Sequence, residues 1–67
     1  MNLTVNGRHR DLPEGVTVAD VVSQLVGDRT AGTAAAVNSE VVPRSTWRTV
    51  SLQDGDEVEV LTAVAGG

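Results

Sequence analysis

The chain has 67 residues, a formal net charge of −4 at pH 7 and no cysteine. This length allows one domain and leaves little room for a deep active-site pocket. The acidic charge argues against nucleic acid as a partner, and the lack of cysteine excludes disulfides, thiolate metal sites and a cysteine nucleophile. Neither a signal-peptide pattern nor the ~18 apolar residues of a membrane span is visible. We therefore expect a cytoplasmic protein that does not associate with membranes.

The first twelve residues predict a β-hairpin. Residues 3–5 alternate apolar and polar side chains, which is typical of a half-buried strand. Asn6-Gly7 is the strongest short hairpin signal, because both residues tolerate the positive φ of a type I′ turn. Residues 8–12 are the expected return strand, and Pro13 begins the segment that ends it.

Residues 17–27 predict one helix. Thr17 is a suitable N-cap and Asp20 follows three residues later, a capping box with Asp in place of the usual Glu or Gln. The valines and the leucine of this segment recur at helical spacing and form one apolar stripe. Gly27 suits the left-handed position that ends many helices, so we expect the helix to cover about residues 18–26.

The rest of the chain predicts three more strands. Residues 34–37 and 40–42 are short apolar segments expected to be strands, the second ended by Pro43. Residues 44–47 predict a turn or a short helical turn, and residues 57–60 alternate as a half-buried strand does. This order predicts an α+β domain: a mixed sheet of four to five strands with one main helix packed on one face. We expect the last strand to lie centrally, beside the first.

The apolar spacing also predicts the core. The expected core residues repeat with a period of 2 in strands or 3.6 in the helix, and they are Leu3, Val5, Val18, Val22, Leu25, Val37, Val58 and Val60.

Four groups of residues have both a structural and a functional interpretation. Trp47 fills the core or anchors a partner, and Arg44 pairs with a carboxylate or with a partner. His9 is the only histidine, and a metal site needs three or four ligands, so we expect His9 to be a surface residue and not a metal ligand. Turn chemistry and a solvated strand face explain the acidic residues near the C-terminus, and docking to a basic partner is the alternative. These acidic residues are Asp54, Asp56, Glu57 and Glu59.

Six segments carry a resemblance to a known family. They are Val5-Asn6-Gly7, Thr17-Val18-Ala19-Asp20, Ala36-Val37-Asn38, Val41-Val42-Pro43-Arg44-Ser45-Thr46-Trp47, Leu52-Gln53-Asp54-Gly55-Asp56-Glu57-Val58-Glu59 and Gly66-Gly67. In this collinear combination the chain resembles the ThiS family, the sulfur carriers of thiamine biosynthesis. The family has Asn-Gly where this chain has Asn38-Ser39. Serine tolerates positive φ less well than glycine, so the type of that turn is left open.

The resemblance implies a ubiquitin-like β-grasp domain over residues 1–62 and a flexible C-terminal tail over residues 63–67. A ThiF-like adenylating enzyme of the E1 type would activate the carboxylate of Gly67 with ATP and magnesium, while the carrier itself binds no cofactor. Sulfur from a persulfide donor enzyme would then displace AMP and leave a thiocarboxylate. A ThiG-like thiazole synthase would use this sulfur, with Val64, Ala65 and Gly66 inside the partner's channel. The chain itself is then not an enzyme.

Three alternatives remain open on the sequence. The small subunit of molybdopterin synthase is a similar carrier, but it has prolines where this chain has residues 62–65, and a carrier for another sulfur-requiring pathway is also compatible. A β-grasp module that binds partners without covalent chemistry would be indifferent to Gly66 and Gly67. A frayed terminus is common in proteins, so the tail alone decides nothing. An independent enzyme is the weakest alternative, since no nucleophile, base or metal cluster supports it.

Overall fold

The computed structural model describes residues 1–28 and 30–62. The predicted site residues lie outside the described residues, and they are Val64, Ala65, Gly66 and Gly67. The division into a domain over residues 1–62 and a tail over residues 63–67 therefore stays a prediction. The described elements are β1 (Asn2–Val5), β2 (Arg8–Asp11), α1 (Val18–Val26), β3 (Thr33–Val37), β4 (Glu40–Val42), the 3₁₀ turn Arg44–Thr46 and β5 (Glu57–Thr62).

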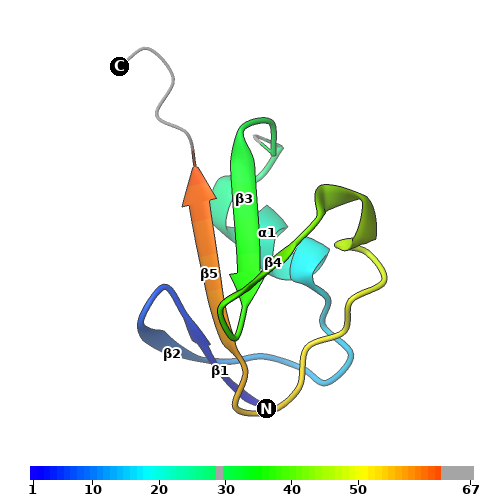
Figure 1. The fold of residues 1–67 in the computed structure, drawn as a ribbon. Coiled ribbons are helices and arrows are strands. Elements are labelled where there is room, and N and C mark those ends of the chain that lie inside the picture. The colour runs from blue at the N-terminus through cyan, green and yellow to red at the C-terminus, as the bar shows by residue number, and fades with distance from the viewer. Residues whose placement is uncertain (29, 63–67) are drawn as a thin grey trace.

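The five strands form one mixed sheet in the order β2-β1-β5-β3-β4. Strand β5 lies in the centre, parallel to β1 on one side and antiparallel to β3 on the other. Helix α1 packs behind the sheet, on one of its faces (Figure 1). The expected α+β architecture, with the last strand central beside the first, is therefore confirmed. No helix among the described residues is long and apolar enough to cross a membrane.

The start of α1 is fixed by the predicted capping box. The N–H of Asp20 donates to Thr17 Oγ1 at 3.2 Å, and the N–H of Thr17 donates to Asp20 Oδ2 at 2.9 Å. The next two helical N–H groups, of Val18 and Ala19, donate to carbonyl oxygens of the segment after the 3₁₀ turn at 3.0 and 3.1 Å. The first turn of the helix therefore already has its hydrogen-bond acceptors, and the helix ends at Gly27 with φ 62°.

The core lies between α1 and the sheet. Its buried apolar residues are Leu3, Val5, Val16, Val18, Val21, Val22, Ala35, Trp47, Leu52, Val58 and Val60. The prediction that Leu25 and Val37 belong to this core is wrong, since both are only partly buried and pack against it. Leu25 stands in the last turn of α1 and Val37 at the end of β3, where each element reaches its end.

The hairpin between β3 and β4 settles the turn that the sequence leaves open. Asn38 has φ 50° and Ser39 has φ 71°, so both central residues have the positive φ that a type I′ turn requires. Asn6 and Gly7 take the same arrangement between β1 and β2, with φ 51° and 80°. Pairing of Val37 with Glu40 leaves two residues for the second loop, and loops of that length favour primed turns.

Candidate functional site at the end of β5

The candidate site is the end of β5, because residues 63–67 follow it in the chain. Gly67 and the three residues before it are not among the described residues, so the structure describes only the strand that precedes them in the chain. Strand β3 pairs with β5 from Thr33 opposite Thr62 to Val37 opposite Val58. On the other side β1 pairs only through Thr4 and Val5. Backbone pairing therefore reaches the end of β5 on the β3 side alone.

The side chain of Asn6 extends the support on the β1 side. The N–H of Val60 donates to Asn6 Oδ1 at 2.8 Å, and Asn6 Nδ2 donates to the carbonyl oxygen of Val60 at 3.2 Å. One carboxamide thus satisfies both backbone groups of Val60 on this side. This places a specific contact two residues before Thr62, where the described part of the chain ends.

Asn38 makes a related contact at the start of β5. The N–H of Glu57 donates to Asn38 Oδ1 at 3.0 Å, and Asn38 Nδ2 donates to Asp56 Oδ1 at 3.0 Å. The N–H of Asn38 donates to the carbonyl oxygen of Glu57 at 2.7 Å. The two hairpin asparagines therefore bond to the same strand at its first residue, Glu57, and at its fourth, Val60. From the sequence, Asn6 is predicted only as a turn residue, although an Asn directly after a strand expected beside β5 is a usable signal for this contact.

The acidic residues before and within β5 divide into two pairs. Asp54 accepts a hydrogen bond from the N–H of Asn2 at 2.6 Å, and Asp56 Oδ2 accepts one from the N–H of Gln53 at 2.8 Å. Turn chemistry therefore explains Asp56, as expected, whereas Asp54 bonds to the start of β1, a contact that the sequence did not predict. Glu57 and Glu59 are exposed and alternate with buried residues, so they project from the sheet face that α1 does not cover. The described residues contain no group of three or more acidic, histidine or cysteine side chains that could hold a metal ion.

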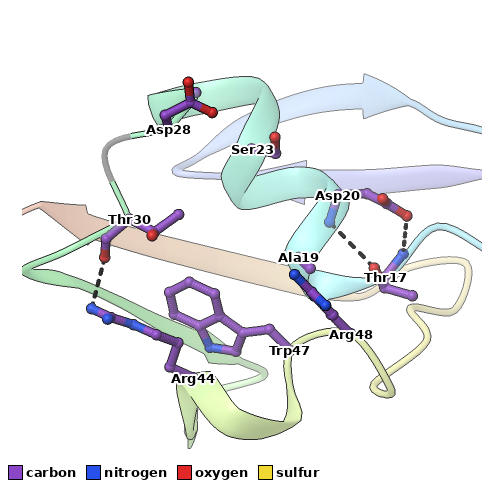
Figure 2. Close-up of a pocket in the computed structure, with 10 residues that line it drawn as sticks. Thr17, Ala19, Asp20, Ser23, Asp28, Thr30, Arg44, Trp47 and Arg48 are labelled. Atoms are coloured by element: carbon purple, nitrogen blue, oxygen red, sulfur yellow. Dashed lines mark hydrogen bonds between the residues drawn. The ribbon is translucent and has the colours of Figure 1, made fainter.

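Trp47 and Arg44 line an open hollow of about 650 Å³ beside α1 (Figure 2). Trp47 is 4% exposed and its Nε1 donates to the carbonyl oxygen of Val42 at 2.8 Å, so its interpretation as a core residue is confirmed. Arg44 lies with its guanidinium 5.8 Å from the centre of the indole ring, and its Nη2 donates to the carbonyl oxygen of Thr30 at 2.8 Å. Arg44 therefore joins the 3₁₀ turn to the loop after α1, a contact that the sequence did not predict.

Comparisons with known proteins agree with one another. The family model described as the ThiS family matches residues 3–67. The chain is 36% identical over the full length of both chains to a protein of Escherichia coli K12 named sulfur carrier protein ThiS. It is also 33% identical to a segment of a protein of Paramagnetospirillum magneticum named thiazole synthase, where it covers 20% of that protein.

Solved structures give the same result for the fold. The crystal structure of the thiamine biosynthesis protein ThiS from Geobacter metallireducens matches with a TM-score of 0.81 and 33% identity, covering both chains completely. A solution structure of a thiamine biosynthesis protein from the same organism matches with a TM-score of 0.80 and 35% identity, covering 88% of that chain. The expected ubiquitin-like β-grasp fold is therefore confirmed. The chain belongs to the ThiS family.

Proposed function

We propose that the chain is a sulfur carrier of thiamine biosynthesis whose reactive group is the α-carboxylate of Gly67. The observation that carries the proposal is the full-length similarity to the sulfur carrier protein of Escherichia coli, in a chain that includes Gly66-Gly67. The carrier performs no catalysis of its own and is a substrate for other enzymes.

The proposed cycle begins with activation of the carboxylate. An oxygen of the Gly67 carboxylate attacks the α-phosphorus of ATP, a magnesium-dependent step on a ThiF-like adenylating enzyme, and pyrophosphate leaves. The persulfide sulfur of a donor enzyme then attacks the carbonyl carbon, and AMP leaves with the C–O bond electrons. A thiol of the donor cleaves the resulting acyl disulfide, which yields a thiocarboxylate on Gly67 and a disulfide on the donor.

Two properties of the last residues suit this chemistry. Glycine has no Cβ, so a nucleophile can approach the carbonyl carbon of Gly67 without steric hindrance, and Gly66 allows backbone conformations closed to other residues. Residues 63–67 would span at most ~16–18 Å when fully extended. That length would allow Val64, Ala65 and Gly66 to occupy a narrow channel of the partner while the folded domain docks outside it.

A ThiG-like thiazole synthase is the proposed acceptor of the sulfur. The support is the protein of Paramagnetospirillum magneticum named thiazole synthase, which contains a segment similar to this whole chain. That protein contains a carrier-like segment and a larger remaining part in one chain. This arrangement favours a physical association between the sulfur carrier and the thiazole synthase. The chain described here would meet its synthase as a separate molecule or as a covalent neighbour.

Mass spectrometry of the intact protein tests the proposal. With ATP, magnesium, a ThiF-like enzyme and a persulfide donor, the wild type should gain the mass difference of one oxygen exchanged for sulfur. Deletion of Gly67 moves the carboxylate by up to ~3.6 Å, and a misplacement of ~1 Å can already cost ~100-fold in rate. We therefore expect sulfur loading to fall by about 100-fold or more in three variants: the Gly67 deletion, a chain with one residue added after Gly67, and Gly66→Val.

The melting temperature of each variant is the control. Among residues 1–28 and 30–62 the buried apolar side chains run from Leu3 to Val60. We expect the three changes in the tail to leave thermal stability close to that of the wild type. Normal sulfur loading of the Gly67 deletion would contradict the carrier function. Loss of loading together with a large loss of stability would instead show that the tail belongs to the fold.

A further inference from the structure

We infer that Asn6 is a positioning residue for the reaction at Gly67, an inference that rests on the proposed function. Asn6 stands in the first hairpin turn, 54 positions before Val60. Its carboxamide nevertheless holds both the N–H and the carbonyl oxygen of Val60, at 2.8 and 3.2 Å. This contact links the N-terminal hairpin to the end of the strand that carries the tail.

The contact replaces backbone pairing that β1 cannot provide. In a parallel pair the hydrogen bonds are evenly spaced along both strands. The N–H of Thr4 donates to Asp56 at 3.0 Å and the N–H of Asn6 donates to Val58 at 2.9 Å, so Val60 is next in the series. Strand β1 ends at Val5, and Asn6 turns out of it with φ 51°. The carboxamide supplies the acceptor and the donor that a longer β1 would have supplied.

The consequence concerns the direction in which the tail leaves the domain. At Val60 the strand lies opposite Ala35 of β3 on one side, and its N–H and carbonyl oxygen bond to Asn6 on the other. Without the carboxamide, β5 beyond Val58 would be held from the β3 side alone and could bend away from β1. The carboxylate of Gly67 would then sample more positions relative to the docked domain, and small misplacements of a reacting group reduce rates strongly.

The identity of the residue fits this role as well as the turn. Asparagine is among the residues that tolerate positive φ, and its amide offers one acceptor and two donors. Glycine tolerates the same φ but has no side chain, so Asn6→Gly removes the contact and keeps the turn. Asn6→Asp keeps the acceptor for the N–H of Val60 and places a second acceptor against the carbonyl oxygen of that residue.

Adenylation kinetics with ATP, magnesium and a ThiF-like enzyme test the inference, with the carrier as the varied substrate. Asn6→Gly should lower kcat by about 10- to 100-fold with KM unchanged, because docking of the domain remains and placement of the carboxylate suffers. Asn6→Asp should show a smaller loss. Asn38→Gly is the matched control, since Asn38 is a hairpin asparagine with nearly the same φ that contacts the start of β5. It should keep the wild-type kcat.

Amide hydrogen exchange reads the contact directly. Exchange at Val60 should become faster in Asn6→Gly, whereas exchange at Val58 should stay slow because its partner is the backbone of β1. All kinetic assays run at a temperature at which melting curves show each variant folded. If Asn6→Gly does not fold, Asn6→Asp carries the test.

The outcomes separate the inference from the function on which it rests. A wild type that is not adenylated overturns the proposed function and the inference with it. A wild type that is adenylated beside Asn6→Gly with the same kcat overturns the inference alone. An equal loss of kcat in Asn38→Gly would show a general weakening of β5, and a loss confined to KM would show a docking defect. Either result also overturns the positioning role.

Discussion

The two faces of the sheet differ in what covers them and in the residues they present. The face under α1 carries the alternate residues Val58 and Val60 of β5, which are 1% and 6% exposed. The opposite face carries Glu57, Glu59 and Leu61 from the same strand, and Leu61 is 67% exposed. Figure 1 shows the helix on one side of the strands only. One strand thus contributes to the core with one set of side chains and meets solvent with the other.

This difference separates stability from interaction. Burial of apolar surface supplies most of the free energy of folding, so the covered face should determine the stability of the domain. Residues of the open face contribute little to that burial and are available for contacts with a partner. Substitutions on the two faces should therefore have different consequences, and three predictions test this separation in order of decreasing effect on stability.

The largest loss of stability is expected for Leu3→Ala. Leu3 lies on β1, faces α1 and is 1% exposed, so its truncation leaves a cavity in the centre of the core. Such substitutions cost about 2–5 kcal/mol. Chemical denaturation of wild type and variant measures the difference in the free energy of unfolding. A cost below about 1 kcal/mol would mean that the site collapses around the smaller side chain and is not rigidly packed.

The second prediction compares neighbours on β5. Val60→Thr buries a hydroxyl group in the core and should cost about 1–3 kcal/mol. Leu61→Thr places the same residue on the open face, where threonine supplies a β-branched side chain that suits a strand, and should change stability by less than about 0.5 kcal/mol. Parallel denaturant melts check both values. Equal costs for the two variants would contradict the assignment of stability to the covered face.

Much of the covered face could be predicted from the sequence. Alternation in residues 57–60 and helical spacing after Thr17 identified the buried sides of β5 and α1, because each element buries one face at its own period. Val16 and Leu52 were missed because they lie outside regular elements and repeat with no period. Leu25 was misassigned since spacing fixes the face of a helix but not how far along it the burial extends.

The contacts at the ends of β5 could be predicted only in part. Asn6-Gly7 and Asn38-Ser39 were recognised as turns from local preferences, yet the partners of the asparagine side chains depend on which strand lies beside them in the fold. Ser39 takes a positive φ that its own preference opposes, because pairing of β3 with β4 leaves a loop of two residues. Loop length, which the sequence already predicted, was the better guide to that turn than the serine.

The smallest effect on stability is expected for Glu57→Gln combined with Glu59→Gln. Both side chains project from the open face of β5, and Asn38 contacts Glu57 only through its backbone N–H and carbonyl oxygen, which the substitution leaves in place. Stability should change by less than about 0.5 kcal/mol.

If these carboxylates guide the carrier to a more basic partner surface, the variant should associate severalfold more slowly with the adenylating enzyme at low salt. Stopped-flow association rates at rising salt provide the measurement, because the Debye length falls from ~10 Å at 0.1 M to ~3 Å at 1 M and screens exposed charges. The wild-type rate should fall toward that of the variant as salt rises. A wild-type rate independent of salt would exclude electrostatic docking through this face, and a large loss of stability in the variant would show that the open face also holds the fold.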